Sequence, residues 1–181
     1  MKSTVRPQQL PDLSRLIRDV PDFPRPGVVF KDVTPLLADP GGLSLAVELL
    51  TQPYRSVHID HVVGAESRGF IFGTAVARNL SAGFIPIRKP GKLPCSTRSA
   101  VYDLEYGTDR VEIHLDALKP GEKILLIDDL LATGGTMKAC CDLVESLGGQ
   151  VAGIAVLIEL AFLKGRDKLS RFPVHSIITY E

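Results

Sequence analysis

Several features that define other protein classes are scarce in this chain. It has three cysteines, an odd number, with Cys140 and Cys141 adjacent and Cys95 apart. That spacing makes neither a disulfide framework nor a set of metal ligands. With no recognisable signal peptide, we expect a protein of the reducing cytoplasm. Cys140 and Cys141 fall on an expected helix and should be core residues, whereas Cys95 should be an exposed thiol.

Net charge and long apolar runs are also missing. The 21 basic and 21 acidic residues cancel, so we expect no nucleic-acid partner and no anionic membrane surface. The apolar runs are too short to cross a bilayer. The Walker-type phosphate-loop pattern Gly-x-x-x-x-Gly-Lys-Ser/Thr does not occur, and neither does the dinucleotide-binding pattern Gly-x-Gly-x-x-Gly. With no internal repeat, the 181 residues are most simply one domain, able to bury about 70% of the surface of the unfolded chain.

The most informative stretch is residues 123–136, KILLIDDLLATGGT. Residues 124–127 are uniformly apolar, as in a parallel strand buried on both faces, and Asp128 and Asp129 are expected to close that strand. A small-residue loop, residues 132–136, then leads into a helix from Met137, so backbone N–H groups can converge on a phosphate. A polar turn with a helix cap would explain the apolar run but not two acids and two glycines together.

The two acids narrow the ligand. A loop that held only phosphate would gain nothing from adjacent negative charges, whereas a ribose phosphate also presents vicinal hydroxyls, which donate hydrogen bonds to carboxylates. The stretch therefore predicts a sugar-phosphate site at the carboxyl edge of an open α/β sheet.

Other segments repeat this geometry. An expected strand at residues 59–65 delivers Glu66, Ser67 and Arg68 before a helix at 70–80. A short strand at 83–87 ends in Arg88, Lys89 and Lys92. Basic runs are often just solvated, but this one falls at the expected ligand edge. Later come an apolar helix from Met137 and strands at 151–158 and 174–180, with a charged turn or helix, expected to be solvated, at 164–168.

Two further parts of the chain, the N-terminal segment and residues 100–115, are expected to lie outside the main sheet. Apolar spacing predicts a short helix from Asp12 through Val20. The proline-rich residues 21–35 should hold no regular element; their apolar side chains must lie on the protein body or on a flat ligand, and the residues alone favour simple packing. A helix should follow Asp39. Possible strands at 100–106 and 111–115 predict a hairpin that could act as a lid. Overall the fold class is α/β, a mainly parallel sheet flanked by helices.

Residues 123–136 resemble the 5-phosphoribosyl-1-pyrophosphate (PRPP) motif of the type I phosphoribosyltransferases. The likeness extends, in order and spacing, to the adenine phosphoribosyltransferase family over residues 12–181. The other matching segments are residues 23–32, 66–70, 88–94, 104–107 and 163–166. The resemblance implies the type I phosphoribosyltransferase fold with an N-terminal hood at about 12–37 and a lid at about 88–115.

The resemblance also implies a reaction and its residues. Such an enzyme transfers phosphoribose from PRPP to N9 of adenine, giving AMP and pyrophosphate, with Mg²⁺ held through PRPP and water and with no direct protein ligand. Members are homodimers. The catalytic residues would be Glu105, Asp128 and Asp129. The PRPP- and AMP-binding residues would be Glu66, Ser67, Arg68, Arg88, Lys89, Lys92, Tyr106, Asp128, Asp129, Ala132, Thr133, Gly134, Gly135 and Thr136, and the adenine-binding residues Val29, Phe30, Lys31 and Leu160. The residues alone favour simple packing of the hood on the protein body, whereas the resemblance implies that the hood contacts adenine.

Two positions depart from the family. Lys31 stands where relatives usually carry arginine, and Pro90 interrupts a run that is more basic in some of them. Because lysine lacks the planar fork of arginine, base affinity would suffer if the contact were made by the side chain. We favour a backbone contact. A PRPP-binding regulator with the same fold, or a phosphoribosyltransferase for another base, remain the alternatives.

Overall fold

The computed structural model describes residues 12–103 and 108–181. These residues divide into two compact units, one ending at Ala46 and the other beginning at Val47. In the part of the chain that the structure describes, no helix is both long and apolar enough to cross a membrane.

The first unit is built on a small hairpin. A 3-10 helix, η1 (Leu13–Leu16), is followed by β1 (Arg18–Pro21), β2 (Val29–Asp32), α1 (Thr34–Ala38) and the start of α2 (Pro40–Thr51). Asp12 caps η1 by accepting a hydrogen bond from the Ser14 backbone. The expected helix through Val20 is wrong, because the residues from Arg18 onward instead pair with β2. The prediction of no regular element in residues 21–35 is likewise wrong, whereas the helix after Asp39 is confirmed.

The second unit is an α/β layer structure, as the sequence predicted. Its main sheet has five strands, all parallel, in the order β4-β3-β7-β8-β9. The strands are β3 (His61–Ala65), β4 (Gly83–Ile87), β7 (Lys123–Leu131), β8 (Gln150–Leu160) and β9 (Val174–Tyr180); the helices are α3 (Arg68–Leu80) and α4 (Gly135–Ser146), and short 3-10 helices lie at η2 (Gln52–Tyr54), η3 (Ala161–Leu163) and η4 (Gly165–Leu169).

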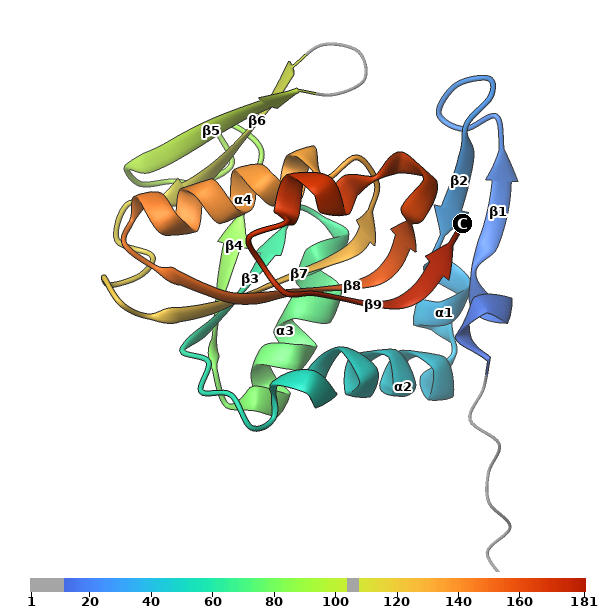
Figure 1. Cartoon of the computed structure of the whole chain (residues 1–181), viewed down its shortest axis with the longest axis horizontal. Coiled ribbons are helices and arrows are strands. Elements are labelled where there is room, and N and C mark those ends of the chain that lie inside the picture. Colours follow the sequence, from blue (N-terminus) through green and yellow to red (C-terminus); the bar gives the residue numbers. More distant parts are fainter. Residues whose placement is uncertain (1–11, 104–107) are drawn as a thin grey trace, which may run out of the picture. The chain divides into compact units, whose positions relative to one another are not determined.

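Alternation along β7 explains the layers. Ile124 and Leu126 belong to the same core cluster as the buried face of α4, which includes Cys140 and Cys141, so both cysteines are core as predicted. Leu125 and Ile127 are equally buried but lie outside that cluster, as expected for the opposite face of a strand with period two. Figure 1 shows α4 on one side of the sheet and α3 on the other.

A separate antiparallel hairpin lies beside α4. It consists of β5 (Thr97–Asp103) and β6 (Thr108–His114), which confirms the predicted hairpin (Figure 1). Its inward residues Val111 and Ile113 join the α4 core cluster. Backbone hydrogen bonds of 2.9 and 2.7 Å between Arg88 and Glu112 connect it to the end of β4. The hairpin is therefore anchored to the segment that carries the basic run.

Candidate functional site

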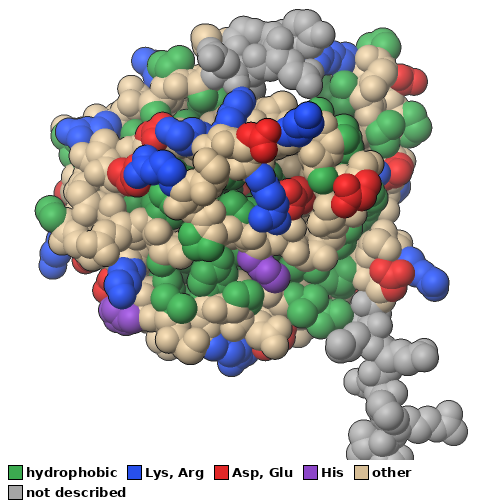
Figure 2. Space-filling model, in the orientation of Figure 1, with side chains coloured by type: hydrophobic (Ala, Val, Ile, Leu, Met, Phe, Trp, Pro, Cys, Tyr) green, Lys and Arg blue, Asp and Glu red, His purple; other side chains and the backbone are tan. Residues whose placement is uncertain are grey.

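A cavity of about 310 Å³ lies at the carboxyl ends of β3 and β7. It is lined by residues 66–68 and 128–137, with Lys89, Tyr102 and Val111. The loop after β3, the acid pair, the small-residue loop and one residue of the basic run thus meet at one place, as the sequence predicted. On the face shown in Figure 2, Lys and Arg side chains are interspersed with Asp and Glu rather than gathered in one field.

The acid pair lies inside β7 rather than at its end. The strand continues to Leu131, because Leu130 and Leu131 still pair with Ile158 and Glu159 of β8. Within a strand, successive side chains point to opposite faces. Asp129 is buried, and its Oδ2 accepts a short hydrogen bond from Arg68 Nε. Asp128 is half-buried, and its Oδ1 accepts from the Asp129 backbone at 2.9 Å.

The ionised form of Asp128 is disfavoured by its surroundings. Its desolvation in the protein, together with the adjacent carboxylate of Asp129, raises the pKa of Asp128 well above its usual range. The nearby guanidinium of Arg68 opposes this rise only in part. A ligand that donates hydrogen bonds to Asp128 would relieve the cost, as the hydroxyls of a ribose do.

The loop after β3 is joined to the basic run. Glu66 accepts hydrogen bonds from Arg88 at 3.1 and 3.2 Å and from the Lys89 backbone at 2.9 Å. The hydrogen bond from Arg88 lowers the pKa of Glu66. Arg88 also donates to the Lys92 carbonyl at 3.3 Å. Neither Arg88 nor Lys92 lines the cavity itself, so their place is beside it.

Lys89 is held by two residues of the hairpin that the sequence did not single out. Its ammonium donates to Asp109 of β6 and, at 3.1 Å, to the Tyr102 hydroxyl of β5, while Tyr102 donates to Asp109 at 3.0 Å. Burial disfavours the charge on Lys89, yet these hydrogen bonds leave its pKa raised. The only available sequence signal was the position of Tyr102 in the predicted hairpin.

The small-residue loop needs its glycines. Gly134 has φ +76°, in the left-handed region, and caps the N-terminus of α4. A Cβ there would collide with the carbonyl oxygen of Gly165, a residue of the segment that the sequence treated as a solvated turn. That prediction is wrong for Gly165, which is buried. Residues 132–136 all line the cavity at the start of the helix, where backbone N–H groups favour an anion.

Leu160 and the predicted hood residues are not among those that line this cavity. Glu105 and Tyr106 fall outside the described residues. Leu160 is buried at the end of β8 and does not line this cavity. In the first unit, Phe30 and Lys31 are half-buried and Val29 is exposed. Lys31 Nζ lies 2.7 Å from Asp19 Oδ1, across the β1–β2 pair.

No ready-made metal cage accompanies the cavity. Among residues 12–103 and 108–181, no group of three or more His, Cys, Asp or Glu side chains could hold an ion. The acid pair instead offers one or two carboxylates next to an expected phosphate site. Mg²⁺ keeps several waters and is bound chiefly through substrate phosphates, so these residues fit an ion that is held by a bound phosphate and its waters, without a direct protein ligand.

An acid pair and a phosphate loop at the carboxyl edge of a parallel sheet define a class of sugar-phosphate-binding α/β proteins. Known proteins narrow that class. Residues 32–176 match the model of the phosphoribosyl transferase domain. An adenine phosphoribosyltransferase from Nitrosococcus oceani is 58% identical over 168 residues, which cover 93% of this chain and 98% of that protein.

Solved structures agree. The adenine phosphoribosyltransferase of Thermoanaerobacter pseudethanolicus matches with a TM-score of 0.91 and 48% identity, covering 93% of this chain and 98% of that one. The Saccharomyces cerevisiae enzyme, complexed with an imino-altritol bisphosphate and adenine, matches with a TM-score of 0.86 and 39% identity, covering 91% and 96%. The chain therefore belongs to the phosphoribosyl transferase family, among the adenine phosphoribosyltransferases. The family that the sequence resembles and the fold class predicted from it are both confirmed.

Proposed function

We propose that this enzyme transfers the 5-phosphoribosyl group of PRPP to N9 of adenine, giving AMP and pyrophosphate in purine salvage. The observation that carries the proposal is the convergence of Asp128, Asp129, the loop 132–136 and residues 66–68 on one cavity. The high identity to adenine phosphoribosyltransferases over nearly the whole chain supports adenine as the base.

Each part of PRPP has a matching part of the cavity. The 5′-phosphate would bind residues 132–136, where the start of α4 and a glycine-rich backbone favour an anion. The ribose hydroxyls would donate to Asp128 and Asp129. The pyrophosphate would bind residues 66–68, with the basic run of Arg88, Lys89 and Lys92 supplying the positive charge around it.

The chemistry depends on charge that is in place before the reaction. As the bond from C1′ to the pyrophosphate oxygen breaks, negative charge grows on the leaving group and positive charge on the sugar. Basic residues at one end and the acid pair at the other would stabilise both, without reorganisation during the step. When bound with PRPP, Mg²⁺ would neutralise part of the pyrophosphate charge, and it would be held through PRPP and water rather than by a direct protein ligand.

Adenine would be held by the hood and by the end of β8. Val29, Phe30 and Lys31 would contact one face of the base and Leu160 the other. The pairing of Lys31 with Asp19 occupies its ammonium, which supports contact with the base through the backbone. Glu105 would form a hydrogen bond with adenine N7 and assist the proton transfer at N9, and Tyr106 would cover the site and exclude water.

The assembly and location follow the family. We propose a homodimer in which part of the basic run reaches the neighbouring site, in the cytoplasm. One functional domain would cover residues 1–181, with a hood at about 12–37 and a lid at about 88–115.

A base panel tests the substrate. Purified protein with PRPP and Mg²⁺ is offered adenine, hypoxanthine, guanine and orotate separately, and nucleotide and pyrophosphate are followed together. AMP from adenine alone supports the proposal. Turnover of another base would keep the mechanism but refute the assignment of the hood, and PRPP binding without consumption of any base would favour a PRPP-binding regulator.

A further inference from the structure

An ion pair between a buried carboxylate and an exposed arginine lies next to the cavity without lining it. Glu159, near the end of β8, is only 5% exposed. Arg166 of η4 donates to both of its carboxylate oxygens, at 2.6 and 2.7 Å, as a planar fork. Ser176 of β9 donates to Glu159 at 2.7 Å, and Arg166 also donates to the Val174 carbonyl at 2.8 Å.

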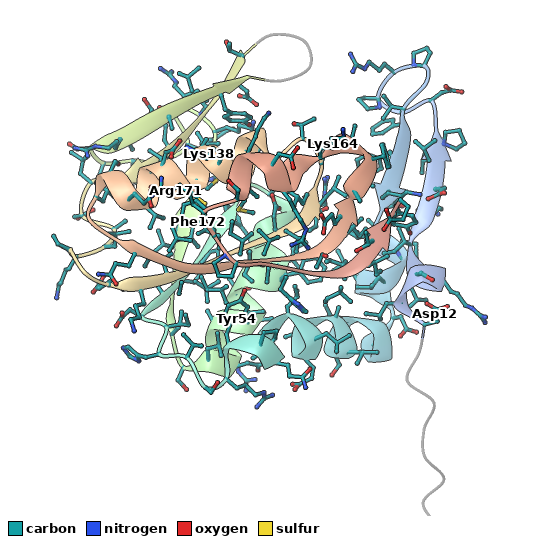
Figure 3. All side chains as sticks on the ribbon, in the orientation of Figure 1. Asp12, Tyr54, Lys138, Lys164, Arg171 and Phe172 are labelled. Atoms are coloured by element: carbon teal, nitrogen blue, oxygen red, sulfur yellow. The ribbon has the colours of Figure 1, made fainter. Side chains whose placement is uncertain are left out.

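This ion pair fixes the turn that begins η4. Arg166 is bonded to both β8 and β9, so its backbone position is set by two strands of the sheet. The hydrogen bonds that Arg166 donates to Glu159 lower the pKa of the Glu159 carboxyl, and the pair stays charged at neutral pH. Figure 3 labels Lys164, which directly precedes η4, and Arg171, which follows it. At the Lys164 end of η4, Gly165 contacts the phosphate loop, and at the other end Leu169 is buried in the core.

The residue next to Arg166 touches the phosphate loop directly. A Cβ on Gly165 would collide with the Ala132 carbonyl oxygen and would lie 3.0 Å from Gly134 N. A Cβ on Gly134 would in turn collide with the Gly165 carbonyl. The two backbones therefore meet with no side chain between them. In the sheet, Glu159 also pairs with Leu131, the residue immediately before the loop.

We propose that the Glu159–Arg166 ion pair positions the 5′-phosphate loop, acting through the contact of Gly165 with Ala132 and Gly134. The inference rests on the proposed binding of the 5′-phosphate at residues 132–136. Glu159 and Arg166 are positioning residues, since neither side chain lines the cavity. A phosphate held by backbone N–H groups is sensitive to small shifts of the loop, because each hydrogen bond weakens steeply with poor alignment.

Binding of the two products separates this role from a general structural one. AMP carries the 5′-phosphate, whereas pyrophosphate belongs at residues 66–68. The variants are Arg166→Lys, which keeps the charge but loses the fork, and Ser176→Ala, a milder change that removes one hydrogen bond to Glu159. The matched control is Glu145→Gln, which breaks the exposed ion pair with Arg171, 3.1 Å apart. Dissociation constants for AMP and for pyrophosphate are measured by calorimetry, alongside thermal unfolding.

We expect Arg166→Lys to weaken AMP binding about 10-fold or more while pyrophosphate binding changes by less than about 2-fold. Ser176→Ala should shift AMP in the same direction by less, and Glu145→Gln should shift neither. In steady state, the KM for PRPP should rise more than kcat falls. Equal weakening of AMP and pyrophosphate, or no change in AMP for both a folded Arg166→Lys and Ser176→Ala, would overturn the inference.

The calorimetric result also separates this inference from the proposed function. If the wild-type enzyme binds AMP but forms none from adenine and PRPP, the proposed function fails while the positioning role can still be measured. If the wild-type protein forms AMP and the variants bind AMP as tightly as the wild type does, the positioning role alone fails.

Discussion

Arg68 Nε donates a hydrogen bond to Asp129 Oδ2 and thereby joins the start of α3 to the acid pair of β7. The carboxylate of Asp129 is 5% exposed and the side chain of Arg68 is 40% exposed. Two candidate ligand-binding segments that are about 60 residues apart in the sequence are thus connected by charge. The cost of removing Arg68 falls mainly on Asp129, which would keep a buried charge without this partner.

Arg68→Gln should therefore lower the free energy of unfolding by about 2 kcal/mol, measured by urea denaturation at pH 7.5. Arg55→Gln is the control, because its ion pair with Glu48 is exposed on both sides and should be worth less than about 0.5 kcal/mol. Equal effects of the two substitutions would contradict the view that Arg68 stabilises a buried charge.

Asp128→Asn should improve stability and abolish most activity. The pKa of folded Asp128 lies above the unfolded value of 3.8, so the ionised carboxyl costs folding free energy above the folded pKa and nothing below 3.8. Asparagine removes that cost. We expect a higher midpoint of thermal unfolding at pH 8, with the gain shrinking as the pH falls toward 3.8, and about a 100-fold loss of kcat. A destabilised variant at pH 8 would refute this account of the acid pair.

Glu66 should contribute to the pH dependence of the free energy of unfolding in the acidic range. Its pKa is lowered in the folded state by Arg88, so its stabilisation is complete above the unfolded value of 4.5 and is lost as the pH falls through the lower folded value. In Glu66→Gln, the free energy of unfolding should depend less steeply on pH below 4.5, with a loss of about 1 kcal/mol at pH 7. Parallel curves for the two proteins would show that the pairing with Arg88 contributes nothing.

Asp109 should weaken the binding of pyrophosphate. Its carboxylate pairs with the ammonium of Lys89 at the edge of the cavity, so a negative charge lies close to the expected leaving group. Asp109→Asn should tighten pyrophosphate binding by about 5-fold at low salt, with the gain falling as ionic strength rises. Tyr102→Phe is the control, since it removes a hydrogen bond to the same Lys89 without changing charge. Weaker binding in Asp109→Asn would mean that Asp109 is needed chiefly to place Lys89.

Lys31 tests how the hood contacts the base. If its side chain serves the pairing with Asp19 and the backbone contacts adenine, Lys31→Arg should leave the KM for adenine within about 3-fold of the wild-type value. A fall in that KM by more than about 10-fold would instead mean that an arginine fork restores a contact that lysine lacks. Initial rates at saturating PRPP measure both outcomes.

The sequence predicted the sheet well because each strand carries its own signal. Residues 124–127 are uniformly apolar, and β4 and β9 begin and end where the pattern placed them. The acid pair and the loop 132–136 were recognisable because their chemistry is local in the sequence. The predicted helix at residues 12–20 was wrong because apolar spacing does not reveal that Arg18–Pro21 would pair with Val29–Asp32.

Contacts between distant segments could not be predicted. Glu159 and Arg166 are seven residues apart, but their partners on β9 are known only once the sheet order is known. Likewise, Lys89 meets Tyr102 and Asp109 because the hairpin is anchored to the end of β4. These contacts decide which charges are exposed and which are paired. Within residues 164–168, which are otherwise exposed as expected, they place Gly165 against the phosphate loop.

The most direct measurement follows the sugar itself. Enzyme, Mg²⁺, adenine and PRPP labelled with ¹⁴C in the ribose are incubated, and the products are separated into AMP and ribose 5-phosphate. The account predicts that the label enters AMP in proportion to the pyrophosphate released, that omission of adenine stops this, and that Asp128→Asn loses it. Label found in ribose 5-phosphate regardless of adenine, or left in PRPP, would contradict phosphoribosyl transfer to adenine.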